Sequence, residues 1–393
     1  PWGTLTGIRP TKIPMKFLEE GKTEAEIRAY MQKTYFASDE KIDLSIDIAE
    51  RELEILKKID YENGYSLYIG IPFCPTTCLY CSFTSYPLVS WRQKVDSYLD
   101  ALEKELDYVA VKFGKKHLNS IYIGGGTPTT LEPYQLDRLI RKIRCSFDLS
   151  HCLEFTVEAG RPDSITREKL ETLKKWDITR ISINPQTMNG ETLKLIGRAH
   201  TPEQAEEAFK RAREAGFDNI NMDLIVGLPG EDAEMVKRTL EKVKKLAPES
   251  LTVHTLAIKR AAHLKQELDK YSFAGDVDEQ LSLVGQAAEE LGLAPYYLYR
   301  QKNMAGNLEN VGYARHGLEC LYNILIMEER TDIIGIGAGS SSKLIRREGD
   351  LDPATGEMIT GTRIDRVENC KSVDDYIARI DEMIDRKKQA FAK

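Results

Sequence analysis

Residues 68–83 read YIGIPFCPTTCLYCSF and place three cysteines at the spacing CxxxCxxC. The three are Cys74, Cys78 and Cys81. Three thiolates on one short segment can ligate three irons of a cubane [4Fe–4S] cluster, whose usual complement is four cysteines. The fourth iron is then open to a small molecule. This spacing is more specific than an isolated CxxC, and it predicts an iron–sulfur centre.

Other interpretations of the cysteine motif require different surroundings. Positions i, i+4 and i+7 fall on one face of a helix. However, Pro72 and Pro75 flank Cys74 and two β-branched threonines follow, which disfavours a regular helix. A disulfide would explain only two of the three cysteines. A structural zinc site stays open as an alternative, but it would need a fourth ligand from elsewhere in the chain.

The chain as a whole has the composition of an ordinary globular protein. It has 393 residues, of which 41% are hydrophobic and 30% charged, so it can bury a large core and form more than one domain. No apolar run approaches the length of a membrane span, and no secretory signal pattern is present. Seven cysteines, three of them grouped, favour a reducing compartment. The net charge of −7 disfavours a general nucleic-acid binder.

Strands alternate with amphipathic helices from residue 66 onward, after an N-terminal region in which we expect helices at 23–32 and 44–59. The predicted strands are 67–71, 120–123, 153–157, 180–183, 220–226 and 251–256. The predicted helices that follow are 91–113, 134–147, one starting after Thr201, and 233–246. Six such units predict an α/β fold with a parallel sheet, and periodicity alone leaves a barrel and an open sheet both possible.

The cysteine stretch resembles the signature of the radical S-adenosylmethionine (SAM) superfamily. Its IPFC lead-in is similar to that of the oxygen-independent coproporphyrinogen III dehydrogenase group, with its HemN, HemW and HemZ types. The resemblance selects a partial (β/α)6 barrel for residues 65–262. It also implies a helical N-terminal extension over 1–64 and a smaller α+β domain over 263–393. Residues 2–11, WGTLTGIRPT, resemble HemZ proteins in particular, and we expect further chain before them.

The same resemblance implies the cofactors and the residues that contact them. SAM chelates the open iron of the cluster held by Cys74, Cys78 and Cys81, and its reductive cleavage yields a 5′-deoxyadenosyl radical. One or two SAM molecules are expected. The implied SAM contacts are Tyr68, Tyr80, Gly125, Gly126, Thr127, Glu158, Gln186, Arg198, Asp223 and Ala257. Of these, Tyr68, Glu158 and Arg198 are also expected to act in catalysis.

Several of these positions also stand out without the resemblance. Residues 124–129, GGGTPT, follow a predicted strand, and consecutive glycines allow close backbone approach and anion binding by main-chain N–H groups. Glu158, Gln186 and Asp223 all lie at or near predicted strand ends, where barrel enzymes place their chemistry. His254 lies within a predicted strand, where a satisfied core histidine is the expectation.

The C-terminal part supplies the candidate substrate residues. Residues 295–302, PYYLYRQK, cluster aromatic and basic side chains on what reads as an exposed strand and loop. Arg300 and Lys302 are the predicted partners of tetrapyrrole propionates, with the aromatic rings against the macrocycle. Residues 333–342, IIGIGAGSSS, resemble a GxGxxS loop that closes over the family's active site, and 373–386 predict a final helix.

Taken together, the sequence predicts a cytoplasmic, monomeric radical SAM enzyme that converts coproporphyrinogen III to protoporphyrinogen IX. An electron donor such as flavodoxin or ferredoxin is an implied partner. Phe83 stands where HemN proteins have a fourth cysteine, and the HNxxYW motif of HemW proteins is absent. Haem trafficking on the same scaffold, and another radical SAM reaction on haem such as methyl transfer with ring opening, remain the alternatives.

Overall fold

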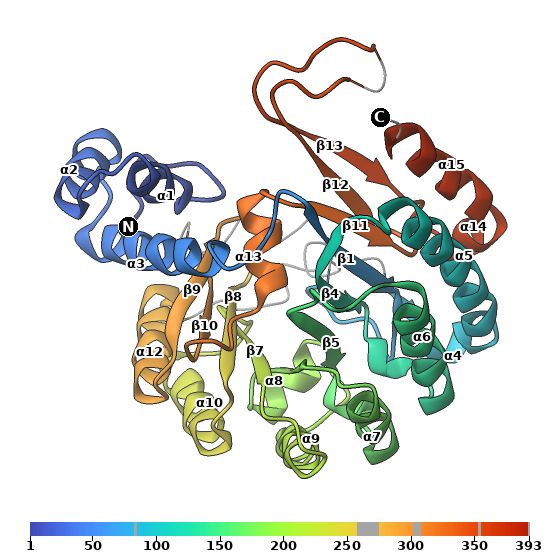
Figure 1. The fold of residues 1–393 in the computed structure, drawn as a ribbon. Helices are drawn as coiled ribbons and strands as arrows, with labels where there is room; N and C mark the ends of the chain where they lie inside the picture. The colour runs from blue at the N-terminus through green and yellow to red at the C-terminus, as the bar shows by residue number, and fades with distance from the viewer. Residues whose placement is uncertain (82–84, 258–274, 302–307, 353–354, 392–393) are drawn as a thin grey trace. The chain divides into compact units, whose positions relative to one another are not determined.

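The computed structural model describes residues 1–81, 85–257, 275–301, 308–352 and 355–391 (Figure 1). The chain forms two compact units, each built from three segments. Unit 1 comprises Pro1–Ile59, Thr77–Ser82 and Ser182–Glu328, and unit 2 comprises Asp60–Thr76, Phe83–Ile181 and Glu329–Lys393. The unit boundaries cut the cysteine motif and strand β6. The division at residues 64 and 262 stays a prediction.

Unit 2 is built on a mixed sheet with the strand order β13-β12-β11-β1-β4-β5. β1 pairs in parallel on both sides, with Leu67 opposite Ile334 of β11 and Ile121 of β4. It is buried along nearly its whole length, which explains its continuous apolar run. The strands are β1 (Gly64–Ile71), β2 (Phe73–Cys74), β3 (Tyr86–Pro87), β4 (His117–Gly125), β5 (Glu154–Gly160), β11 (Asp332–Ile336), β12 (Ser341–Arg346) and β13 (Arg363–Glu368).

Helices pack on this sheet through apolar faces. In Figure 1 the C-terminal helices α14 and α15 lie beside α5, within unit 2. The helices are α4 (Leu88–Trp91), α5 (Val95–Phe113), α6 (Pro133–Ser146), α7 (Arg167–Lys175), α14 (Val373–Ala378) and α15 (Ile380–Phe391), with short 3-10 turns at Arg92–Lys94, Pro128–Thr130 and Pro162–Ser164.

Unit 1 carries strands in the order β6-β7-β8-β10-β9. β7 and β8 are parallel, whereas β10 runs antiparallel to both β8 and β9. The strands are β6 (Arg180–Gln186), β7 (Ile220–Val226), β8 (Ser250–Thr255), β9 (Ala294–Tyr299) and β10 (Asn310–Ala314). The helices are α1 (Lys12–Glu19), α2 (Glu24–Tyr35), α3 (Asp39–Leu56), α8 (Gly190–Leu195), α9 (Pro202–Glu214), α10 (Ala233–Leu246), α12 (Val277–Glu290) and α13 (Leu321–Glu328).

Hydrogen bonds and an ion pair connect the N-terminal helix α3 to β9, β10 and the residue before β10. Arg51 of α3 donates from Nη1 to Ala294 O at 2.7 Å and from Nη2 to Ala314 O at 2.9 Å. Lys41 pairs with Glu309 at 2.6 Å, and both side chains are almost fully buried. Residues 1–59 therefore pack with residues 182–328 within unit 1.

The predicted strands all occur, and the main differences lie at the two ends of the chain. The opening segment, for which no helix was predicted, contains α1. Residues 333–336, predicted as part of a loop, belong to strand β11. The predicted final helix is two helices that meet at Arg379, the residue following α14. Among the described residues, no helix combines the length and apolarity that crossing a membrane requires.

Candidate active site

The cysteine motif is an irregular segment rather than a helix. Cys74 ends β2 in unit 2, whereas Cys78 and Cys81 belong to the 77–82 segment of unit 1. All seven cysteines have free thiols, so the motif forms no disulfide. Cys78 is 8% exposed, and the other two thiols of the motif are half-buried.

No three His, Cys, Asp or Glu side chains of the described residues meet at a position that could hold a metal ion. The donor set nevertheless fits an iron–sulfur cluster, because three thiols that form no disulfide lie within eight residues of sequence. Metal binding is commonly coupled to the ordering of the segment that carries the ligands. The metal assignment of the three cysteines stays a prediction.

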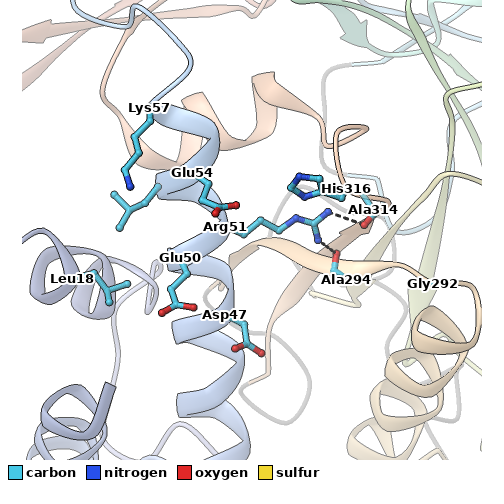
Figure 2. Close-up of a pocket in the computed structure, with 11 residues that line it drawn as sticks. Leu18, Asp47, Glu50, Arg51, Glu54, Lys57, Gly292, Ala294, Ala314 and His316 are labelled. Carbon is cyan, nitrogen blue, oxygen red and sulfur yellow. Dashed lines mark hydrogen bonds between the residues drawn. The ribbon is translucent and has the colours of Figure 1, made fainter. Parts of the chain in front are cut away.

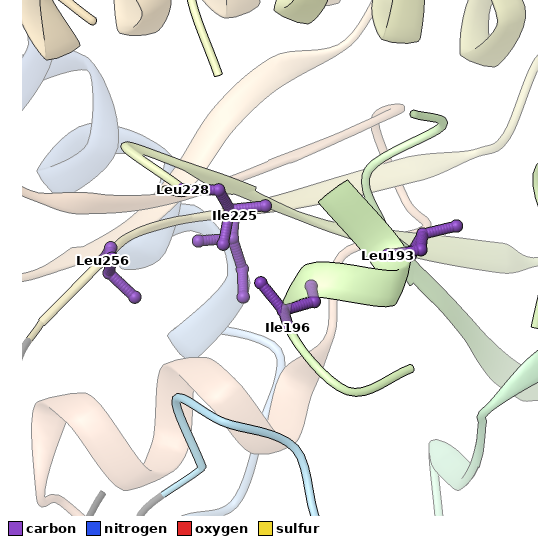
Figure 3. Close-up of a cluster of buried hydrophobic side chains, with 5 residues drawn as sticks. All are labelled: Leu193, Ile196, Ile225, Leu228 and Leu256. Atoms are coloured by element: carbon purple, nitrogen blue, oxygen red, sulfur yellow. The ribbon is translucent and has the colours of Figure 1, made fainter. Parts of the chain in front are cut away.

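The part of the motif in unit 1 is held by packing against an apolar cluster. Leu79 N donates to Ile196 O at 3.0 Å. Leu79 and Tyr80 pack against five buried side chains, shown in Figure 3: Leu193, Ile196, Ile225, Leu228 and Leu256. These residues come from α8, β7 and the ends of β7 and β8. The backbone that carries Cys78 and Cys81 therefore rests on an ordered core.

Arg198 connects this segment to the end of β6. Its Nε and Nη2 donate to the Tyr80 hydroxyl at 3.2 and 3.1 Å, and its Nη1 donates to Asn184 O at 2.7 Å. Gly197, at φ +75°, makes the left-handed turn that brings Arg198 inward after α8. Burial raises the pKa of the Tyr80 phenol, so its hydroxyl stays protonated at neutral pH. Tyr80 and Arg198, both predicted site residues, are thus in direct contact.

Gln186 is the second predicted residue at the end of β6. It adopts φ +70°, a left-handed conformation that is uncommon for a residue other than glycine. The side chain is only 7% exposed, and its Oε1 accepts no hydrogen bond from the described residues. A strained backbone together with a buried, unsatisfied acceptor is typical of a ligand-binding position. This geometry fits the predicted role of Gln186 in binding SAM.

Asp223 of β7 is held from one side by Asn221. Asn221 Nδ2 donates to Asp223 Oδ1 at 2.6 Å and to Ser182 Oγ at 2.8 Å. His254 Nε2 of β8 lies 3.7 Å from Asp223 Oδ2. The His254 side chain is 32% exposed, so it is not the satisfied core histidine that we expected. Ala257, half-buried just after β8, is the last described residue before a gap.

In unit 2 the predicted residues gather at the ends of β1, β4 and β5. Tyr122 donates a hydrogen bond from its hydroxyl to Glu158 Oε1 and stacks on Tyr68 with ring centroids 6.3 Å apart. Burial and the Glu158 charge raise the pKa of the Tyr68 phenol. A Cβ on Gly125 would lie 3.3 Å from the Tyr68 hydroxyl. Tyr122 therefore lies in contact with two predicted site residues, and sequence analysis did not name it, although its alternation with Gly124 on β4 places it on the same face.

The glycine-rich loop packs closely on β1. Gly126 N donates to Ile71 O at 2.8 Å, and Thr127 N donates to Phe73 O at 2.7 Å. These two amides thus donate their hydrogen bonds to carbonyl groups of the protein. The close backbone approach that the sequence predicts for the loop is its packing against β1 and the residues that follow it. Thr127 Oγ1 donates to Cys74 Sγ at 3.5 Å. The loop therefore positions a motif cysteine and Thr127 together.

Substituting Gly126 with alanine should disrupt this packing. A Cβ there would lie 2.6 Å from Phe73 O and 2.9 Å from Ile71 O, which are backbone atoms that cannot rotate away. We expect Gly126→Ala to destabilise the protein by about 1–3 kcal/mol and to weaken SAM binding. Chemical denaturation and anaerobic equilibrium dialysis would measure the two effects. Gly285→Ala in α12 is the matched control, because a Cβ there meets no atom within 4 Å; equal stability of the two variants would contradict the prediction.

Arg300 does not lie where the sequence analysis expected it. Its side chain is 5% exposed, and Nη1 donates to Leu5 O at 2.6 Å. The guanidinium carbon lies 5.7 Å from the centroid of the Trp2 ring. Arg300 is thus bound to the N-terminal segment, and this burial disfavours the predicted contact with a substrate propionate. Lys302, the other predicted partner, lies outside the described residues.

A cavity of about 680 Å³ opens elsewhere in unit 1 and contains none of the predicted site residues. Figure 2 shows the carboxylates of Asp47, Glu50 and Glu54 around Arg51, all on α3. Burial raises the pKa of Asp47 and of Glu50, with further contributions from neighbouring acidic groups. Arg51 is paired with Glu319 at 2.7 Å. The cavity is an acid-lined pocket on the N-terminal helices rather than part of the predicted site.

Comparison with known proteins identifies relatives over most of the chain. A family model of the radical SAM superfamily matches residues 68–243. The oxygen-independent coproporphyrinogen-III oxidase-like protein HemZ of Bacillus subtilis is 47% identical over 354 residues, covering 88% of this chain and 70% of that protein. The haem chaperone HemW of the same organism is 35% identical and covers 70% of each chain.

A solved structure supports the same assignment at the level of the fold. Coproporphyrinogen III oxidase (HemN) from Escherichia coli, described as a radical SAM enzyme, aligns with a TM-score of 0.63 and 25% identity. The alignment covers 84% of this chain and 73% of that one. The predicted α/β fold class is confirmed.

Proposed function

Because the chain belongs to the radical SAM superfamily and to its HemN, HemW and HemZ group, which use a [4Fe–4S] cluster and SAM, we propose that it decarboxylates coproporphyrinogen III. Two propionates would become vinyl groups, giving protoporphyrinogen IX. Each propionate gives up a hydrogen atom, CO2 and one further electron, so the reaction needs an electron acceptor. The resemblance to HemZ over 88% of the chain carries this proposal.

The residues present fit the two cofactors. Cys74, Cys78 and Cys81 provide three thiols for the cluster, and none of them is in a disulfide. Gln186 offers a buried acceptor that no described residue satisfies, as expected of a group that binds a ligand. When bound, the cluster and SAM supply a 5′-deoxyadenosyl radical, which can remove a hydrogen atom from an unactivated C–H bond.

The protein's own groups hold and orient these partners. In unit 2 the glycine loop, Tyr68 and Glu158 form one polar face beside Cys74. In unit 1, Arg198 fixes Tyr80 next to Cys81, while Gln186 and Asp223 present acceptors from β6 and β7. We propose that these residues bind SAM, that Tyr68, Glu158 and Arg198 assist catalysis, and that Ala257 contacts SAM through its backbone or methyl group.

Anaerobic turnover tests the proposed reaction. The protein would be reconstituted with iron and sulfide, reduced, and incubated with SAM, coproporphyrinogen III and an electron acceptor. We expect 5′-deoxyadenosine together with a product that has lost two carboxyl groups, both measured by chromatography. Formation of 5′-deoxyadenosine without a decarboxylated product would support radical SAM chemistry but would exclude coproporphyrinogen III as the substrate. A methylated or ring-opened haem product would identify the other radical reaction instead.

A second candidate is haem trafficking, which the 35% identity to a haem chaperone favours. The absence of the HNxxYW motif disfavours it. Stoichiometric haem binding without turnover of any porphyrinogen would select this function. For either function we propose a monomer in a reducing cytoplasm, supported by the seven free thiols, with a flavodoxin or ferredoxin as electron donor.

A further inference from the structure

Three ionisable side chains form a line on three strands of unit 1. Asp223 lies on β7, His254 on β8 and Tyr299 at the end of β9. The Tyr299 hydroxyl is 3.4 Å from His254 Nδ1, and His254 Nε2 is 3.7 Å from Asp223 Oδ2. The His254 and Asp223 side chains are 32% and 19% exposed, so the line is partly open to a ligand.

β10 lies between β8 and β9, and its Asn310 is the residue opposite Tyr299. Gly312 of β10 lies opposite Tyr297, and a Cβ there would lie 1.9 Å from Tyr297 Cε1. The Tyr297 ring therefore occupies the space above β10, and it stacks on Tyr299 at 6.1 Å with an interplanar angle of 13°. This stacking fixes the direction in which the Tyr299 hydroxyl points.

The hydrogen-bonding roles along the line follow from the chemistry of its members. Burial raises the pKa of the Tyr299 phenol to about 12, so the hydroxyl keeps its proton at neutral pH. It can then donate to His254 Nδ1, which places the imidazole proton on Nε2, facing the carboxylate. Asp223 Oδ1 already accepts from Asn221 at 2.6 Å. At 3.7 Å from Nε2, Oδ2 has no full hydrogen bond and keeps an acceptor position for another donor.

We propose that His254, oriented by Tyr299, is a positioning residue that aims the Asp223 carboxylate at hydrogen-bond donors of SAM. The inference rests on the proposed function, in which Asp223 contacts SAM. It assigns His254 and Tyr299 the role of orienting the Asp223 carboxylate. Neither the cysteine motif nor the glycine loop has that role. The imidazole supports the carboxylate from one side, because its Nε2 lies 3.7 Å from Asp223 Oδ2.

Among the described residues, the ionisable groups next to His254 are Asp223 from β7 and Tyr299 from β9, with Tyr297 behind Tyr299. β10 contributes the neutral Asn310 and Gly312. Removing the imidazole or the Tyr299 hydroxyl should therefore weaken the support of the Asp223 carboxylate and lower the affinity for SAM.

The test measures SAM binding to the reconstituted, cluster-loaded protein by anaerobic equilibrium dialysis. We expect His254→Ala to raise the Kd about tenfold, and Tyr299→Phe, which removes one oxygen, to raise it severalfold. His254→Gln keeps a donor toward Asp223, so it should restore most of the affinity. His316→Gln is the control, since its imidazole lies 3.8 Å from Glu319 but outside this line.

The outcomes separate the inference from the proposed function. If His254→Ala and Tyr299→Phe bind SAM like the wild type, the positioning role is wrong while the proposed function stands. If the cluster-loaded wild type binds no SAM, the proposed function fails, and the inference fails with it. Thermal denaturation of each variant shows whether a loss of affinity comes from unfolding, and Tyr299→Phe keeps the test decisive should His254→Ala not fold.

Discussion

Alanine at Cys74, Cys78 or Cys81 is expected to leave the anaerobically reconstituted protein without a stable [4Fe–4S] cluster. In the predicted assignment these three thiolates are the cluster's protein ligands, so losing one would leave two irons without protein ligands. Iron and acid-labile sulfide should fall from about four of each per chain toward zero. 5′-Deoxyadenosine formation should drop below detection, because reductive cleavage of SAM would lose its source of the electron.

The remaining cysteines provide the control. Cys145 is exposed and Cys152 half-buried, and both have free thiols in unit 2. Burial raises the pKa of the Cys152 thiol to about 12, so it is a poor source of thiolate. Cys145→Ala and Cys152→Ala should both retain the cluster. A variant that lacks all three motif thiols and still holds a full cluster would disprove the assignment.

Much of the fold was predictable because its signals are local. β7 and α10 occupy the predicted ranges, Ile220–Val226 and Ala233–Leu246, since their apolar periodicity is strong and their ends carry turn or capping residues. β11 was missed because Asp332–Ile336 is short and ends near glycines, and its strand character comes from pairing with β1, far away in sequence. α1 was missed because the Gly, Pro and Thr residues around it read as loop.

The site was predictable at the level of strand ends but not at the level of contacts. Sequence analysis identified Tyr80 and Arg198 separately, but their hydrogen bonds depend on the turn at Gly197 and on the cluster beneath Leu79. Arg300 was misplaced because a cation beside aromatic residues reads as an exposed binding surface. Its actual partners, Trp2 and Leu5, are at the other end of the chain, and no local pattern indicates them.

A second large effect is expected from the fully buried ion pair between Lys387 of α15 and Glu105 of α5. Lys387 Nζ lies 2.7 Å from Glu105 Oε1, and neither side chain is exposed. The carboxylate also accepts hydrogen bonds from Asn369 Nδ2 at 2.8 Å, Tyr376 Oη at 2.6 Å and Gly337 N at 2.9 Å. Four donors thus fill the acceptor positions of one carboxylate.

This pair links the C-terminal helix to the GxGxxS-like loop. Gly337, the second glycine of the GxGxxS pattern, adopts φ +98°, and a Cβ there would lie 2.5 Å from Gly70 O of β1. Lys387 also donates to Asn369 Oδ1 at 2.9 Å, and Asn369 donates to Gly337 O at the same distance. The loop is therefore held against β1 by a network whose only positive charge, among the groups just named, is Lys387.

Lys387→Met should destabilise the protein by about 3–5 kcal/mol, because it leaves a buried carboxylate without its counter-charge. The melting temperature should fall by roughly 6–20 °C. The double variant Glu105→Gln/Lys387→Met removes both charges, so it should recover part of the loss, and the difference measures the coupling. Lys388→Met, at the next residue, is the matched control. Lys388 forms an exposed ion pair with Asp385 at 2.7 Å, and this pair should contribute at most about 1 kcal/mol to the free energy of unfolding. Equal denaturation midpoints for the Lys387 and Lys388 variants would show that the buried pair contributes no more than a surface one.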